Sequence, residues 1–176
     1  MFYSLISVMD SARWLRHRGF VVSLGLVLLC ACHDVKEPLS KIETAQVRTA
    51  NQLLSGFYPP ENGAWCWTAR EFAAALKPPD GAETRGATLE LQFYIPDSQI
   101  ESIGPMTLSA ETEGYVMDSQ TFSKGGMYVY SRKVPKEALA TSLLPVKFSF
   151  DKARAPFIGD GRELAAIVSR IELQTD

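Results

Sequence analysis

Two tryptophans separated by one residue are the feature of this sequence that points most directly to binding chemistry. In an extended strand, Trp65 and Trp67 lie on one face and Cys66 lies on the other. Two aromatic rings on one face of a β-domain suit sugar binding, because the apolar face of a sugar ring stacks on indole. Tyr58 is a nearby candidate for the same surface. The alternative interpretation is that these aromatic side chains fill the hydrophobic core.

A second group of candidates surrounds the segment Asp160-Gly161-Arg162-Glu163. A guanidinium binds a carboxylate through two parallel hydrogen bonds, and Glu61 is the partner that we predict for Arg162. Glu61 and Asp160 are also the carboxylates that we consider for glycoside hydrolysis, which needs two carboxyl groups about 5–10 Å apart. We favour a structural ion pair of Glu61, Asp160 and Arg162, with a polar cleft for hydroxyl groups as the alternative, and we predict no catalytic residue.

The scarcity of histidine and cysteine excludes several kinds of site. Beyond residue 31 the only histidine is His33, and the only cysteines are Cys32 and Cys66. A Ser-His-Asp triad, a Cys–His pair and a histidine-based metal site therefore lack their residues. We expect no internal disulfide, no metal and no cofactor, and we expect Cys66 to be a small buried hydrophobic residue.

The N-terminal residues follow the order of a bacterial export signal. Arg13, Arg16 and Arg18 precede an apolar run over residues 20–29, and Ala31 precedes Cys32. The segment Leu29-Cys30-Ala31-Cys32 resembles the lipobox of bacterial lipoproteins. The resemblance implies that Cys32 is acylated, for example with palmitate, and that the signal peptide, residues 1–31, is removed.

Two alternatives to lipidation are a transmembrane anchor and cleavage after Ala31 without lipid. The apolar run is about a dozen residues long, whereas a spanning helix needs about 20. In the lipoprotein sorting of enteric bacteria, Asp after the lipidated cysteine favours the inner membrane. His33 in that position therefore predicts the outer membrane, facing the periplasm, in an organism that has one.

The mature chain has the size of one domain and a mildly acidic charge. Without Asp10, Arg13, Arg16 and Arg18, the formal net charge of −2 becomes −4. No cluster of Lys or Arg is present, so we expect no nucleic-acid binding. Residues 33–48 are polar and have no clear period, and we predict that residues 32–48 are the lipidated N-terminus and a flexible tether. Extended, sixteen residues reach roughly 50 Å.

Residues 49–176 are predicted to form the folded domain. Residues 49–55 favour a short helix ended by Gly56, and Asn62-Gly63 is typical of a tight hairpin turn. Residues 70–76 fit a strand or a helix. Ala87–Ile95 is the clearest strand, with Thr88, Glu90, Gln92 and Tyr94 on its wet face. Other expected strands cover residues 64–69, 106–111, 115–117, 120–122, 127–134, 146–150 and 165–173, and residues 135–140 fit a helical turn.

About eight short strands with frequent turns predict an all-β fold, an antiparallel β-sandwich or jelly roll like that of carbohydrate-binding modules. In the last strand we expect Ile167 and Ile171 on one face and Val168 on the other. This fold class places paired aromatic residues of one strand on a sheet face.

The order of several short motifs resembles that in small uncharacterised β-sandwich modules of bacteria, some of which are appended to membrane glycosyltransferases. The motifs are Gly56-Phe57-Tyr58, Glu61-Asn62-Gly63, Trp65-Cys66-Trp67-Thr68 and Asp160-Gly161-Arg162-Glu163-Leu164. The likeness covers about residues 53–173. Ala165 stands where a glycine often follows the last motif, and Cys66 stands where Arg often precedes the tryptophan. The resemblance implies an accessory role related to carbohydrate or to the cell envelope.

Together these features predict a lipid-anchored, non-catalytic envelope protein that binds glycan or another envelope component. The candidate contacts are Tyr58, Glu61, Trp65, Trp67 and Arg162. The alternative is an assembly lipoprotein that binds a protein partner, which an exposed apolar patch around Tyr128 and Tyr130 would favour. A glycan-active enzyme is the third candidate, and it requires Glu61 and Asp160 to face each other without an intervening arginine.

Overall fold

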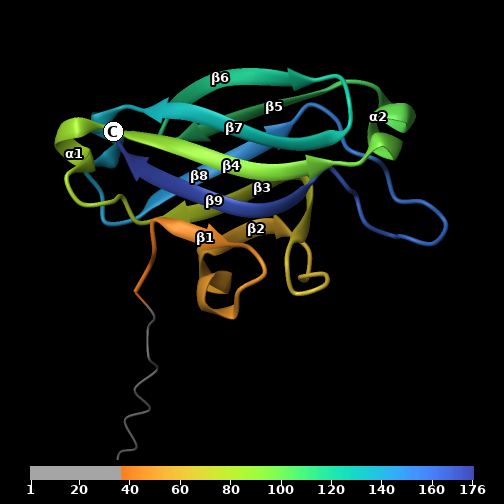
Figure 1. Ribbon diagram of the computed structural model, residues 1–176, viewed down its shortest axis with the longest axis horizontal. Helices are drawn as coiled ribbons and strands as arrows, with labels where there is room; N and C mark the ends of the chain where they lie inside the picture. The colour runs from red at the N-terminus through yellow and green to blue at the C-terminus, as the bar shows by residue number, and fades with distance from the viewer. Residues whose placement is uncertain (1–36) are drawn as a thin grey trace, which may run out of the picture. The chain divides into compact units, whose positions relative to one another are not determined.

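The computed structural model describes residues 37–176, which form an antiparallel β-fold (Figure 1). The predicted signal peptide, the lipidation site Cys32 and the sorting residue His33 lie outside the described residues. Within residues 37–176, no helix is long and apolar enough to cross a membrane. The elements in chain order are β1 (Lys41–Glu43), η1 (Val47–Gln52), β2 (Leu53–Phe57), β3 (Cys66–Leu76), α1 (Ala82–Arg85), β4 (Ala87–Ile95), α2 (Asp97–Ile103), β5 (Met106–Thr112), β6 (Tyr115–Phe122), β7 (Gly126–Val134), η2 (Lys136–Leu139), β8 (Leu144–Phe150) and β9 (Ile167–Thr175).

The strands follow the order β6-β5-β8-β3-β9-β4-β7, with β1 paired to β9 and β2 paired to β3. Strand β3 belongs to both layers. Its first residues, Cys66 and Trp67, pair with β9, and its part from Glu71 to Leu76 pairs with β8. We call β7, β4, β9, β1 and the start of β3 the front sheet, because they face the viewer in Figure 1. The back sheet is β2, the rest of β3, β8, β5 and β6. The predicted antiparallel β-sandwich is confirmed.

Alternating apolar residues of both sheets fill the space between the layers. Every second residue of β4 is buried, and the same alternation holds in β8. Aromatic rings form the centre of the core: Phe72 stacks on Phe148 with ring centroids 5.0 Å apart, and Phe93 meets Phe122 edge-on at 5.2 Å. The strict period of two is the reason that β4 has the predicted bounds.

A β-bulge in β9 corrects the predicted faces of this strand. Gln92 of β4 pairs with Arg170 and Phe93 pairs with Val168, so Ser169 is the extra residue. The insertion shifts the alternation by one position. Val168 and Ile171 therefore both point into the core, whereas Ile167 lies on the outer face.

The predicted tether is too long, because its second half is part of the sandwich. Ile42 of β1 is fully buried, and Thr44 donates a hydrogen bond from Oγ1 to the carbonyl of Val168 at 2.7 Å. Leu39 is held as well, since Lys77 N donates to its carbonyl at 3.1 Å. Strand β1 has only three residues, which is too few to show a clear alternation of apolar and polar residues in the sequence.

The short helix predicted over residues 49–55 is confirmed only as far as Gln52, and its predicted end at Gly56 is wrong. A 3₁₀-helix ends at Gln52, and Gly56 lies inside β2 with a φ of +73°. A Cβ atom at this glycine would collide with the backbone of Glu71 and Phe72, so glycine is required by the close approach of β2 to β3. The ambiguous segment 70–76 is strand, and its alternation rather than its helix propensity decides its structure.

Candidate functional site

A hairpin over residues 57–67 brings several of the predicted site residues together. Asn62 and Gly63 have φ values of +51° and +63°, as a type I′ turn requires. The two arms pair through Tyr58 N to the carbonyl of Trp67 and through Glu61 N to the carbonyl of Trp65, each at 2.9 Å. The predicted Asn-Gly turn is confirmed, and it places Tyr58 and Glu61 beside the two tryptophans.

The two tryptophans lie on the outer surface rather than in the core. Cys66 between them points inward and is 1% exposed, whereas Trp65 and Trp67 are both partly exposed. The alternative that the tryptophans fill the core is therefore wrong. Cys66 donates from Sγ to the carbonyl of Thr44 at 3.3 Å, and burial raises the pKa of its thiol. Its predicted role as a small buried residue fits this environment.

The strand register sets an apolar row across the outer face of the front sheet. Trp67 pairs with Ile167, Ile167 pairs with Tyr94, and Tyr94 pairs with Met127. A pocket of about 290 Å³ opens on this row and is lined by Trp65, Tyr94, Met127, Ile167 and Ser169. We call it the front pocket. Four of its five walls are apolar or aromatic side chains, so its interior offers van der Waals contact rather than charge.

One wall of the front pocket, Trp65, carries a buried polar group without a protein partner. Nε1 of Trp65 is buried and has no hydrogen-bond acceptor among the described residues. A buried donor without an acceptor costs about 1–3 kcal/mol. This side chain therefore has unused hydrogen-bonding capacity in addition to its ring face.

Arg162 is held between two carboxylates. Nη1 of Arg162 lies 2.9 Å from Oε1 of Glu61, and Nη2 lies 2.8 Å from Oδ2 of Asp160. The guanidinium carbon also lies 5.3 Å from the centre of the Tyr58 ring. The structure thus contains the predicted pair of Arg162 with Glu61. We call these four residues the Arg162 cluster.

The electrostatics of the Arg162 cluster do not suit acid–base catalysis. Hydrogen bonds from the side chain and backbone of Arg162 lower the pKa of Asp160 to about 2 from its ordinary value of 3.8. The two carboxylates in turn raise the pKa of Arg162. Asp160 is therefore ionised at neutral pH and cannot donate a proton to a leaving group. Arg162 stands between Asp160 and Glu61, which is the arrangement that the enzyme hypothesis had to avoid.

The predicted site residues thus separate into two neighbouring groups. Trp65 lines the front pocket and Trp67 continues its apolar row, whereas Tyr58, Glu61 and Arg162 interact with one another. The residues that sequence reasoning missed are Tyr94, Met127, Ile167 and Ser169. Alternation already placed Tyr94 on the wet face of its strand, but the other three become neighbours only through the pairing of four strands.

The tyrosines considered as an interface are packed in the structure. Tyr130 is fully buried, and its hydroxyl donates to the carbonyl of Asp118 at 2.8 Å. Tyr128 packs on Phe93 and Phe122 of the core. Tyr130 and the partly buried Tyr128 therefore do not form the exposed apolar patch that would favour an assembly role.

Among residues 37–176 there is no group of three or more His, Cys, Asp or Glu residues that could hold a metal ion. Glu61 and Asp160 instead form ion pairs with Arg162. Ser169 lies beside the apolar side chains of the front pocket.

No protein-family model and no curated protein matches the sequence. Several solved structures, among them the following three, have a similar chain path. A carbohydrate-binding module, CBM36 in complex with calcium and xylotriose, has 15% identity and a TM-score of 0.41, over 76% of this chain and 98% of that one. A CBM4 structure has 11% identity and a TM-score of 0.34, over 77% and 85% of the chains.

The third structure is dimeric latent PorU from Porphyromonas gingivalis, with 17% identity and a TM-score of 0.37 over 60% of this chain. The match spans only 10% of the PorU chain. At these identities and scores the likenesses concern the chain path. The function of this protein has to be argued from its own side chains.

Proposed function

We propose that the protein is a non-catalytic binding protein of the bacterial cell envelope whose front sheet binds glycan. The observation that carries the proposal is the front pocket, in which Trp65 and Tyr94 stand on an accessible sheet face. Burying large aromatic side chains away from water stabilises a protein or a complex. Leaving two of them at an open pocket is therefore typical of a surface that is covered by a ligand.

A sugar ring suits this pocket for a physical reason. The C–H groups on one face of a pyranose are apolar, whereas its edge carries hydroxyl groups. Indole and phenol rings cover the apolar face, and Met127 adds an adaptable thioether wall. The unpaired N–H of Trp65 offers a donor to a sugar oxygen once the indole shifts to expose it.

A non-catalytic role is supported by the state of the carboxylates. Glu61 and Asp160 both bind Arg162, and neither lines the front pocket. Glycoside hydrolysis needs one carboxylic acid that is protonated at the pH of the reaction. The low pKa of Asp160 opposes that role.

We further propose that lipid on Cys32 anchors the domain, with the outer membrane favoured by His33. The tether is shorter than the predicted residues 32–48, because Leu39 already forms hydrogen bonds with Gln52 and Lys77 of the domain. Leu39 is seven positions after Cys32, a stretch that reaches at most about 25 Å when it is extended. The anchored domain would therefore stay close to the lipid headgroups, where it meets envelope glycans.

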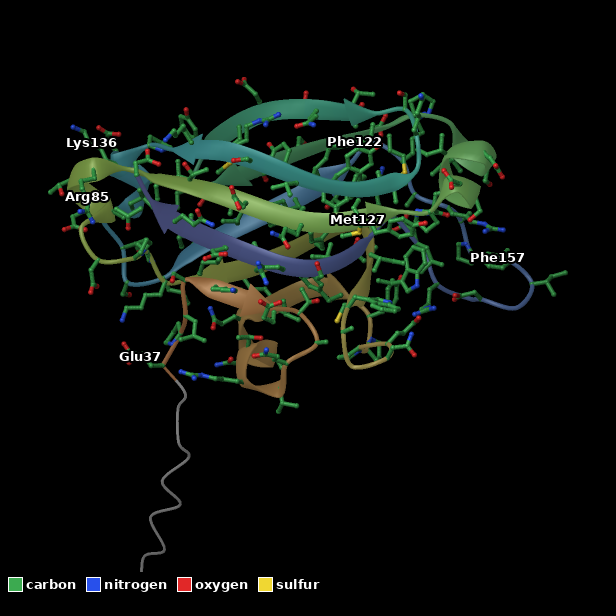
Figure 2. The ribbon with its side chains drawn as sticks, in the orientation of Figure 1. Glu37, Arg85, Phe122, Met127, Lys136 and Phe157 are labelled. Atoms are coloured by element: carbon green, nitrogen blue, oxygen red, sulfur yellow. The ribbon has the colours of Figure 1, made fainter. Side chains whose placement is uncertain are left out.

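A protein partner is the second candidate, and the loop between β8 and β9 favours it. Ile158 at the tip of this loop is fully exposed and Phe157 is 41% exposed. Figure 2 shows Phe157 on the loop that projects beyond α2, away from the strands of the front sheet. Exposed apolar side chains on a projecting loop are suited to insertion into a groove of another protein.

The test is glycan binding by the domain with one pocket aromatic removed. A glycan array and pull-down on purified peptidoglycan provide the probes. We expect Tyr94→Ala to weaken binding at least tenfold, because the ring contact is lost. Tyr115→Ala is the matched control, since Tyr115 is a partly exposed tyrosine outside the front pocket.

Two results would overturn the glycan proposal. One is an absence of binding to every glycan on the array and to peptidoglycan by the unaltered domain. The other is equal binding by Tyr94→Ala and Tyr115→Ala. Capture of one defined envelope protein that is abolished by Ile158→Asp and unaffected by Tyr94→Ala would establish the second candidate instead.

A further inference from the structure

The front sheet continues beyond the front pocket as two ordered rows of side chains that are polar except for Val129. The row next to the apolar one consists of Val129, Gln92, Arg170 and Glu43, and the row after it consists of Ser131, Glu90, Glu172 and Lys41. Each row crosses β7, β4, β9 and β1. We call these eight residues the polar platform, and Figure 1 shows its four strands side by side.

The bulge at Ser169 joins the front pocket to the polar platform. Ser169 lines the pocket, and its hydroxyl donates to the carbonyl of Gln92 at 3.4 Å. The next residue, Arg170, is the first charged member of the platform. Bulges re-aim side chains next to functional sites. Here the extra residue lets apolar and polar rows follow each other without a gap along β9.

Two half-buried side chains of the polar platform have polar groups that remain free. Arg170 is held by Glu43 at 2.9 Å, and Glu90 accepts from Gln174 at 3.4 Å. In contrast, the side chains of Gln92 and Glu172 form no hydrogen bond or ion pair with any residue of the described domain, although both are half-buried. Polar groups at such positions need water or ligand hydroxyls as partners.

The charges of the polar platform balance closely. Glu43, Glu90 and Glu172 are opposed by Lys41 and Arg170, and both of these cations already pair with Glu43, at 3.5 Å and 2.9 Å. A phosphorylated or carboxylated ligand would need spare Lys or Arg groups. The platform therefore suits an uncharged ligand that is rich in hydroxyl groups.

The distance from the apolar row to the last row of the platform exceeds one sugar ring. Tyr94 and Glu90 are four residues apart on β4, which corresponds to about 13 Å. On the basis of the proposed glycan binding, we infer that the ligand is a neutral oligosaccharide that lies along β4 and β9. One ring stacks in the front pocket, and the following rings bind Gln92 and Glu172.

Calorimetric titration with oligosaccharides of increasing length tests this inference. The probes are chito-oligosaccharides and cello-oligosaccharides of one to five rings, both neutral and β-1,4-linked, and oligogalacturonates of the same lengths as acidic probes. We expect the affinity for one neutral series to rise at least tenfold between one and three rings and then to level off, and we expect weaker binding of the acidic series.

Variants separate the polar platform from the front pocket. Gln92→Ala and Glu172→Gln should each remove most of the gain with length and leave the affinity for one ring unchanged. Glu111→Gln is the matched control for Glu172→Gln, because Glu111 is an outward-facing glutamate of the back sheet. It should titrate like the unaltered domain.

Equal affinity for one and three rings, or tighter binding of the acidic series, would overturn the inference. The proposed function would still stand in that case if Tyr94→Ala weakened glycan binding. Failure of every neutral series to bind, with glycan-array binding retained, would also overturn the inference. Loss of all glycan binding by the unaltered domain would overturn both.

Discussion

The two outer faces of the sandwich have the same alternating pattern but different chemistry. On the back sheet, Lys147 lies 3.3 Å from Glu71 and 3.8 Å from Glu111. The hydroxyls of Thr107 and Thr121 lie 2.9 Å apart. The front sheet instead presents the front pocket and the unpaired Gln92 and Glu172. The polar side chains of the back face satisfy one another, whereas those of the front face leave capacity for a ligand.

The difference shows that a wet sheet face is not a functional face by default. Both faces cover the same core, and both follow the period-two pattern of half-buried strands. What distinguishes them is whether side chains find partners within the sheet. The presence of aromatic residues alone is insufficient, because Tyr130 of the front sheet is buried and bonded to Asp118.

The largest effect is expected from a residue that supports both faces. Phe72 lies on β3, the strand shared by the two sheets, and it stacks on Phe148 and meets Phe57 edge-on at 5.3 Å. Phe72→Ala should lower the free energy of unfolding by about 3–5 kcal/mol, because it removes a fully buried ring and leaves a cavity. Urea denaturation followed by tryptophan fluorescence measures the change.

Phe157→Ala is the control for Phe72→Ala. Phe157 is 41% exposed, and its ring contacts Arg154 with the guanidinium carbon 3.9 Å from the ring centre. Its removal should cost under about 1 kcal/mol. Similar losses in the two variants would show that the core does not hold the two faces together as described.

A positive charge introduced at the rim of the front pocket should weaken glycan binding, whereas the same charge on the back sheet should not. Neither substitution should unfold the domain. Met127 is 69% exposed and lines the front pocket, and Val116, outside this pocket, is 68% exposed. Figure 2 shows Met127 near the end of β4 that is closer to α2. Met127→Arg should reduce glycan affinity at least tenfold, about 1.4 kcal/mol, because a guanidinium replaces an apolar wall.

Val116→Arg should leave glycan affinity unchanged, since this side chain does not line the front pocket. Thermal unfolding should show both variants within about 0.5 kcal/mol of the unaltered domain, as is usual for exposed positions. An equal loss of affinity in both variants would mean that net charge, rather than the front pocket, controls binding.

The sequence predicts a feature well where the feature is local. The alternation in Ala87–Ile95 determines its bounds and its buried face, and Asn62-Gly63 specifies its turn. Opposite charge was sufficient to pair Arg162 with Glu61, although 101 positions separate them. These predictions depend on residue type and on short spacing, which a sequence displays directly.

The front pocket could not be predicted because it depends on register. Ile167 and Met127 become neighbours of Tyr94 through two different strand pairings. The bulge at Ser169 then reverses which side of β9 is buried, and no residue type at that position indicates it. For the same reason β1 was assigned to the tether, since three residues acquire their strand character only by pairing with β9.

The smallest effect on the free energy of unfolding is expected when ion pairs are removed, either in the Arg162 cluster or at Lys147. The folded-state pKa of Asp160 is about 2 and lies below its ordinary value of 3.8. A lowered pKa means that the ion pair stabilises the folded state above about pH 4 and that this contribution is lost as the pH falls toward 2. Unfolding measured between pH 2 and pH 5 should therefore show a steeper acid loss in the unaltered domain than in Asp160→Asn.

Lys147→Ala is the counterpart on the back sheet. Its partners are about half exposed, at 51% and 53%, so solvent screens both pairs, and the substitution should cost no more than about 1 kcal/mol at neutral pH. It should also retain the acid loss of the unaltered domain, because the Arg162 cluster is intact. If Asp160→Asn kept the full acid loss, the cluster would be no better fixed than the exposed pairs of the back face. Its side chains would then be free to bind a ligand, and the distinction between the two faces would have to extend to the Arg162 cluster.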